Sequence, residues 1–114
     1  MLVAIIGLVL GVIIGLFLPN FYPAEYSFYI SIAVLAALDS IFGAVRSNME
    51  GRFDMAIFIS GFLGNAVLAG ALAFIGDKMG VPLYYAAIFV FGGRLFQNFA
   101  VIRRLLIDKY FRKK

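Results

Sequence analysis

Long apolar stretches dominate this 114-residue chain and decide what it can fold into. Hydrophobic residues make up 64% of the sequence and charged residues only 14%, whereas about a quarter of the residues in a typical soluble domain are charged. A helix needs about 20 mainly apolar residues to cross a hydrocarbon core about 30 Å thick, so the chain has room for about four spans. The sequence therefore predicts an all-α fold, a polytopic transmembrane helical bundle that forms a single domain over residues 1–114.

Proline, glycine and polar residues divide the apolar sequence into four predicted spans. They occupy residues 2–18, 28–46, 54–75 and 83–103, and the last helix continues past Arg103 into a basic tail, residues 104–114. Pro19 and Pro23 break the chain after the first span. The seventeen residues of that span reach only about 25 Å. The alternative is therefore a three-span protein, in which the first segment is too short to cross or lies in the membrane interface.

Basic residues predict the orientation of the bundle, because loops rich in Lys and Arg stay on the cytoplasmic side. In a four-span protein the tail and the turn that holds Arg46 and Arg52 both lie inside only if the N-terminus is also inside. We therefore expect a multi-pass protein of the cell membrane with both termini in the cytoplasm. The residues assigned to the cytoplasmic side are Arg46, Arg103, Arg104, Lys109, Arg112, Lys113 and Lys114.

The basic tail also predicts contact with membrane lipids. It acts either as a topology anchor or by binding acidic phospholipids, to which each basic residue near the surface contributes about 1 kcal/mol. A short basic cluster beside a membrane helix is ordinary, so we expect no nucleic-acid binding.

Two charged residues, Asp39 and Arg94, interrupt otherwise apolar spans. Charges at bilayer depth are costly, and they usually mark a functional site. Asp39 lies seven residues, about 10 Å, before Arg46, and Arg94 lies nine residues, about 13 Å, before Arg103. These similar depths predict that the two charges are partners in the inner half of the bundle.

Three carboxamides extend this predicted pair. Asn65 lies eleven residues, about 16 Å, past Asp54, at a similar depth in its own span. Gln97 and Asn98 follow Arg94 at i+3 and i+4, which places all three on one helix face. The predicted intramembrane polar cluster is Asp39, Asn65, Arg94, Gln97 and Asn98.

Three roles are open for this cluster. It can be a hydrogen-bonded core that fixes helix register, a site for an anionic lipid head group, solute or ion, or a contact with the transmembrane helix of another protein.

Glycines predict close helix packing. Gly7, Gly11 and Gly15 recur every four residues on one face of the first span, and Gly61 and Gly64 give the third span a similar surface. The ridge in the first span forms either a homo-oligomer interface or an intramolecular contact with the second or third span.

The chain lacks cysteine and histidine, which removes disulfides, thiol chemistry and the commonest transition-metal ligands, so no metal or cofactor is expected. Asp39 and Arg94 are the only ionisable residues in the deep layer, and acid–base catalysis would need a further positioned group. We therefore expect no catalytic residues and a function other than enzymatic. The leading hypothesis is a subunit or scaffold that acts through helix–helix contacts, as a homo-oligomer or with a membrane-protein partner; the alternative is a small oligomeric channel or transporter that uses the polar cluster.

Two stretches carry a family resemblance. Residues 31–47, SIAVLAALDSIFGAVRS, and residues 86–106, AAIFVFGGRLFQNFAVIRRLL, resemble the hallmark stretches of the bacterial "small basic protein" family, whose members are membrane proteins of unknown function. The resemblance covers nearly the whole chain. It implies a cell-envelope context, since members are encoded near cell-division and envelope genes, and it supplies no catalytic residues. The residues of interest that lie within these stretches are Asp39, Arg46, Arg94, Gln97, Asn98, Arg103 and Arg104.

Overall fold

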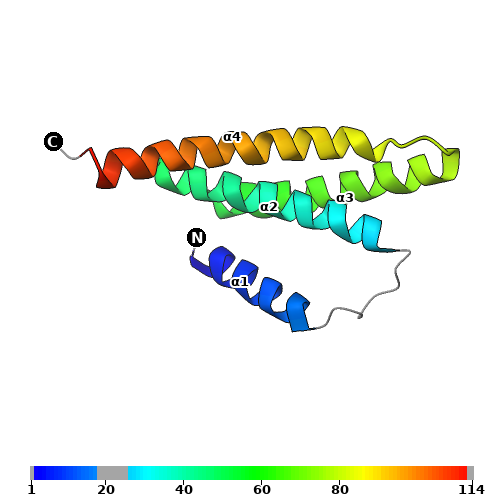
Figure 1. Ribbon diagram of the computed structural model, residues 1–114, viewed down its shortest axis with the longest axis horizontal. Coiled ribbons are helices and arrows are strands. Elements are labelled where there is room, and N and C mark those ends of the chain that lie inside the picture. Colours follow the sequence, from blue (N-terminus) through cyan, green and yellow to red (C-terminus); the bar gives the residue numbers. More distant parts are fainter. Residues whose placement is uncertain (1, 18–25, 113–114) are drawn as a thin grey trace.

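The computed structural model of the chain is all-helical, as the apolar pattern predicts (Figure 1). It describes residues 2–17 and 26–112. The described helices are α1 (Leu2–Phe17), α2 (Ser27–Met49), α3 (Met55–Met79) and α4 (Tyr84–Tyr110). Lys113 and Lys114, which the sequence assigns to the basic tail, lie outside the described residues.

Three of these helices, α2, α3 and α4, are long and apolar enough to cross a membrane. Their 23, 25 and 27 residues correspond to about 35, 38 and 40 Å at a rise of 1.5 Å per residue. Each of these helices extends beyond the C-terminal end of its predicted span. Residues 47–49 and 104–110, which follow the apolar runs of α2 and α4, are still helical. The expectation that the last helix continues beyond Arg103 is confirmed.

Helix α1 has 16 residues, about 24 Å, and is shorter than the three candidate spans. It lies beside α2 and runs in the opposite direction (Figure 1). A groove of about 720 Å³, lined by apolar residues of α1, α2 and α3, separates it from the other helices. The membrane crossing of α1, and with it the four-span topology, stays a prediction.

Helix α2 is the centre of the bundle. It packs against both α3 and α4, whereas α3 and α4 contact each other far less. The hydrophobic core lies toward the α3–α4 loop and is built largely from small side chains, which let the helix backbones approach closely. Its buried residues are Ile32, Ala36, Ala69, Ala73, Ala87 and Phe91.

Local chemistry explains where α3 begins and ends. The Asp54 carboxylate accepts hydrogen bonds from the backbone N–H groups of Ala56 and Ile57 and so caps the first turn. Gly80 ends the helix in the left-handed conformation, with φ of 71°, which glycine adopts without steric cost.

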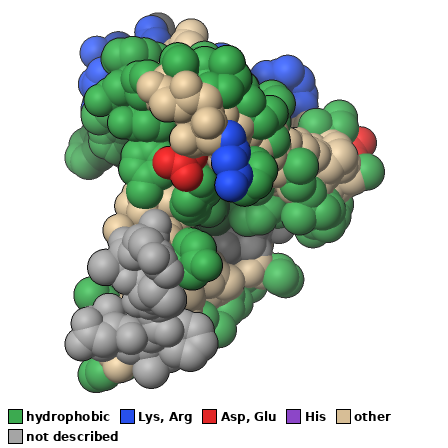
Figure 2. Space-filling view, turned by 90° about the vertical axis from the view of Figure 1, so that its right-hand side faces the viewer, with side chains coloured by type: hydrophobic (Ala, Val, Ile, Leu, Met, Phe, Trp, Pro, Cys, Tyr) green, Lys and Arg blue, Asp and Glu red, His purple; other side chains and the backbone are tan. Residues whose placement is uncertain are grey.

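Hydrophobic side chains cover much of the surface at the α3–α4 loop end of the bundle, as a lipid-facing protein requires (Figure 2).

Candidate functional site: a polar groove between α3 and α4

Asp39 and Arg94 face each other between α2 and α4. The Arg94 Nε donates to Asp39 Oδ1 at 3.2 Å, and Nη2 donates to Oδ2, so the guanidinium binds the carboxylate through two parallel hydrogen bonds. Such bidentate pairs are the strong form of the arginine–carboxylate contact. The structure thus brings together the two charges that the sequence places at similar depth.

The two members of the pair differ in burial. Asp39 is 1% exposed, whereas 48% of the Arg94 side chain is exposed. Arg94 lies ten residues into α4, about 15 Å from its start, which is half the thickness of a 30 Å hydrocarbon core. Its guanidinium also lies over the Phe91 ring, 5.7 Å from the centroid. The chain therefore covers the Asp39 carboxylate completely and the Arg94 side chain only in part.

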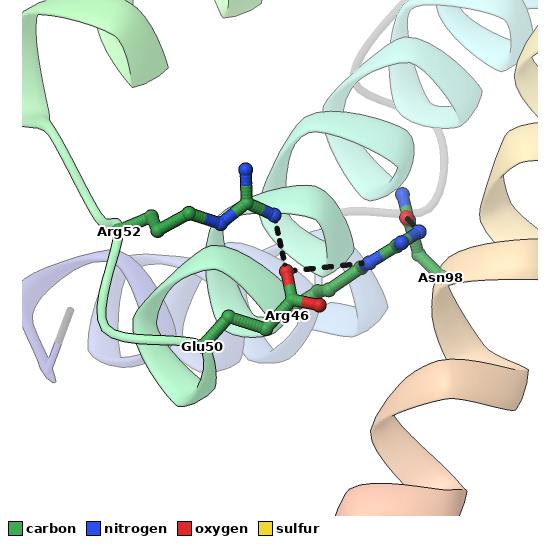
Figure 3. A network of polar contacts seen from close by, with 4 residues as sticks. All are labelled: Arg46, Glu50, Arg52 and Asn98. Atoms are coloured by element: carbon green, nitrogen blue, oxygen red, sulfur yellow. Dashed lines mark hydrogen bonds and ion pairs between the residues drawn. The ribbon is translucent and has the colours of Figure 1, made fainter.

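A second polar contact joins the same two helices nearer the α2–α3 turn. The Arg46 Nη1 donates to the side-chain oxygen Oδ1 of Asn98 at 3.1 Å. Glu50 lies between two guanidinium groups, with its Oε1 3.6 Å from Arg46 Nε and in contact with Arg52 Nη2 (Figure 3). The hydrogen bond from Arg52 is the main reason that the pKa of Glu50 lies below its usual value of 4.5. Asn98 therefore bonds to Arg46, not to Arg94 in the turn before it.

These contacts border a groove of about 230 Å³ between α3 and α4, with α2 as its floor. The groove opens where α3 and α4 separate, and it ends at the α2–α3 turn. Its polar lining comes from all three helices and from the turn: Asp39, Ser40, Ser47, Arg52, Asp54, Asn65, Arg94 and Asn98.

The predicted cluster is therefore only partly assembled. Asn65 lines the groove, but it makes no hydrogen bond to any described residue. The placement of Gln97 in the cluster is wrong: its side chain is exposed on the outer face of α4 and has no described partner. The angle explains this, because i+3 lies about 60° from Arg94 on the side away from α2, whereas i+4 lies about 40° toward it.

The glycines predicted for close packing do not pack closely within the chain. A Cβ atom at Gly7, Gly11, Gly15, Gly61 or Gly64 would have nothing within 4 Å. The intramolecular interpretation is thus not observed, and an interface between copies at the ridge of Gly7, Gly11 and Gly15 stays a prediction.

Sequence reasoning missed the lining residues Ser40, Gly43 and Ser47 of α2. Gly43 and Ser47 follow Asp39 at i+4 and i+8, a helical spacing that could have identified them. Gly43 lies next to the Asn98 side chain: a Cβ there would be 3.5 Å from Asn98 Nδ2, an ordinary van der Waals contact. Among the described residues, no group of three or more His, Cys, Asp or Glu could hold a metal ion.

Fold and site together define a class: a small all-helical protein with three helices fit to cross a membrane and an ion pair between two of them. Residues 22–107 match the model of a family described as protein of unknown function (DUF1290), and the chain belongs to this family. The match includes α2 and α3 in full, with α4 up to Ile107.

Two relatives illustrate the range of similarity. The "Small basic protein" of Bacillus subtilis (strain 168) is 52% identical over 110 residues, which cover 96% of this chain and 91% of that protein. An uncharacterized protein of Mycobacterium tuberculosis (strain ATCC 25618 / H37Rv) is 42% identical over 80 residues, 68% of this chain and 66% of that protein. No solved structure matches the chain.

Proposed function

We propose that this protein is a non-enzymatic membrane subunit or scaffold of the bacterial cell envelope, and that it binds the transmembrane helix of a partner along the groove between α3 and α4. The observation that carries the proposal is the half-exposed Arg94 side chain at mid-span depth. An unpaired charge at this depth costs about 3 kcal/mol. Asp39 neutralises Arg94, but lipid tails give the exposed N–H groups of its guanidinium no hydrogen-bond acceptor, so their contact with lipid tails is unfavourable. A partner helix that covers the groove removes the exposed cation from lipid.

The unused hydrogen-bonding groups of the site support the same proposal. Arginine has five N–H donors, and Asp39 takes only those on the Nε side of the guanidinium. Nη1 of Arg94 and the carboxamide of Asn65 have no acceptor or donor among the described residues, although both side chains line the groove. A polar side chain of a partner helix satisfies such groups, as is usual in membrane bundles.

Affinity capture from native membranes after crosslinking in mild detergent tests this function. Replacing both charges with neutral polar residues, Asp39→Asn with Arg94→Gln, leaves no unpaired ion. We expect this double variant to fold and to lose the captured partner. Asp108→Asn, which alters an exposed acid on the tail, is the control and retains it. If the double variant captured the same partner in the same yield, the groove would not be the binding surface.

A second function is favoured by the polar lining of the groove itself. Asp39, Asn65, Arg94 and Asn98 reach into the bundle from different helices, as in a pathway for an ion or small solute. A chain of this size forms such a pathway only as an oligomer. Folded protein in liposomes that passes no ion or solute across a broad panel rules this function out.

A further inference from the structure

One exposed face of α4 carries a carboxamide at membrane depth. Gln97 lies thirteen residues, about 20 Å, into the helix, and its exposed side chain has no hydrogen-bond partner among the described residues. Lipid tails offer neither donor nor acceptor, and Gln side chains at this depth hydrogen-bond across helices. Gln97 does not line the groove, so a partner in the groove does not account for it.

Gln97 belongs to a regular row of residues along this face, which we call the α4 seam. The seam residues are separated by alternating steps of four and three: Ala86, Val90, Gly93, Gln97 and Ala100. An average step of 3.5 residues is the spacing of two helices that wrap around each other with a left-handed twist. Four of the five residues are exposed, and Ala100 is partly buried. The two nearest seam residues to Gln97, Gly93 and Ala100, are small, which lets a second backbone approach closely.

Glycine at position 93 is not required by the packing of this chain. A Cβ at Gly93 would have nothing within 4 Å, so an alanine, which forms helices better, would fit. The same is true of Gly92, which lies about 100° away around the helix and off the seam. Gly93 therefore leaves an open space one turn from the unpaired carboxamide of Gln97.

We propose that α4 pairs in parallel with α4 of a second copy of this chain, and that the two Gln97 carboxamides hydrogen-bond to each other across a two-fold axis. In a two-fold interface each seam residue meets its own counterpart. A carboxamide is both donor and acceptor, so it is complementary to itself. A single polar residue at such a position also sets register and oligomeric state. The flanking Arg94 does not oppose the contact, because Asp39 neutralises its charge.

This proposal rests on the proposed function, since it names one helix contact of the subunit, but it concerns a different surface from the groove. A cysteine scan of α4 in native membranes tests it. The natural chain contains no cysteine, so each introduced thiol reports alone. We expect disulfide-linked dimers from Ala86→Cys, Val90→Cys and Ala100→Cys. We expect little from Phe89→Cys and Phe96→Cys, whose native side chains are 74% exposed but off the seam.

Two further variants examine the cause of the pairing. Gln97→Leu in the Val90→Cys background should lower the dimer yield about fivefold, as expected for the loss of one interhelical hydrogen-bond pair. Gly93→Leu should lower it as well, whereas Gly92→Leu, the matched control, should leave it unchanged.

The outcomes separate this proposal from the proposed function. Crosslinking that does not follow the 3.5-residue period overturns the α4 pairing, and so does a dimer yield that Gln97→Leu leaves unaltered. Neither result affects the capture of a partner in the groove, which is a separate experiment. Seam dimers without any groove partner leave the α4 pairing intact and overturn the groove.

Discussion

At the scale of single residues, the unequal burial of the Asp39–Arg94 pair has a measurable consequence. Arg94→Gln leaves a carboxylate that is 1% exposed without its cation, whereas Asp39→Asn leaves a half-exposed guanidinium that still has a carboxamide oxygen as acceptor. Breaking a buried pair costs about 3 kcal/mol or more. We expect Arg94→Gln to lower the free energy of unfolding by about that amount and Asp39→Asn to lower it by less.

Unfolding in mixed micelles measures this difference. Asp108→Asn is a suitable control, because the exposed Asp108–Arg112 pair on the tail contributes little to stability. Exchanging Asp39 and Arg94 should restore part of the lost stability. Equal losses for the two single variants would show that burial does not control the energetics of the pair.

Glu50, in the turn between α2 and α3, makes the stability of the folded protein depend on pH. Its pKa is lowered from 4.5 chiefly by the hydrogen bond from Arg52, so the charged form is favoured in the folded protein. A lowered pKa contributes stability above the unfolded value, and this contribution is lost as the pH falls through the folded value. We expect the difference in melting temperature between the natural chain and Glu50→Gln to be constant above about pH 5 and to vanish in stronger acid. A constant difference down to the acid limit would mean that the ion pairs do not form.

At the scale of elements, Gly76 is the tightest contact between α3 and the loop that follows it. A Cβ on Gly76 would lie 2.4 Å from the Val81 carbonyl oxygen and 2.9 Å from the Leu83 nitrogen, both backbone atoms that cannot move alone. Overpacking of this kind costs about 1–3 kcal/mol. Gly76→Ala should therefore lower thermal stability, whereas Gly70→Ala, on the same helix with open space, should not. Equal melting temperatures for the two variants would contradict this placement of the loop.

Helices are the level at which the sequence predicts best. Runs of about 20 apolar residues between Pro, Gly and polar turns are long-range signals, and the described helices follow them. Helix ends were predicted less well, because polar residues such as Ser47 and Asp77 continue a helix once its neighbours hold it. The pairing of Asp39 with Arg94 could be predicted because depth depends on residue count alone.

Other parts of the site depend on rotation and spacing, which a residue count does not supply. Gln97 and Asn98 are neighbours in sequence, yet only Asn98 faces α2, since the direction of a side chain depends on where the helix packs. The groove depends on α3 and α4 separating around α2, which is a property of three helices together.

For the whole molecule, the course of α1 decides the topology. If α1 crosses the membrane beside α2, the N-terminus and the basic tail lie on the same side. We expect a thiol at Val3→Cys to be protected from an impermeant maleimide in intact cells, as a thiol at Lys109→Cys is, and one at Val81→Cys in the α3–α4 loop to react. All three native side chains are exposed. Reaction at Val3→Cys in intact cells would support three spans with α1 outside.

The close contact at Gly76 also makes the α3–α4 loop the point about which α3 can rotate. Helices α3 and α4 are held together at that end, so a small rotation of α3 about the loop moves its near end little and its far end most. Arg52 lies in the turn before the far end of α3, and about 32 Å of helix separate Met55, where α3 begins, from Gly76. The groove lies along the far half of α3 and reaches the turn, so its occupation would displace the charged turn on one side of the membrane. An event inside the bilayer would in this way reach the water at the end of α3.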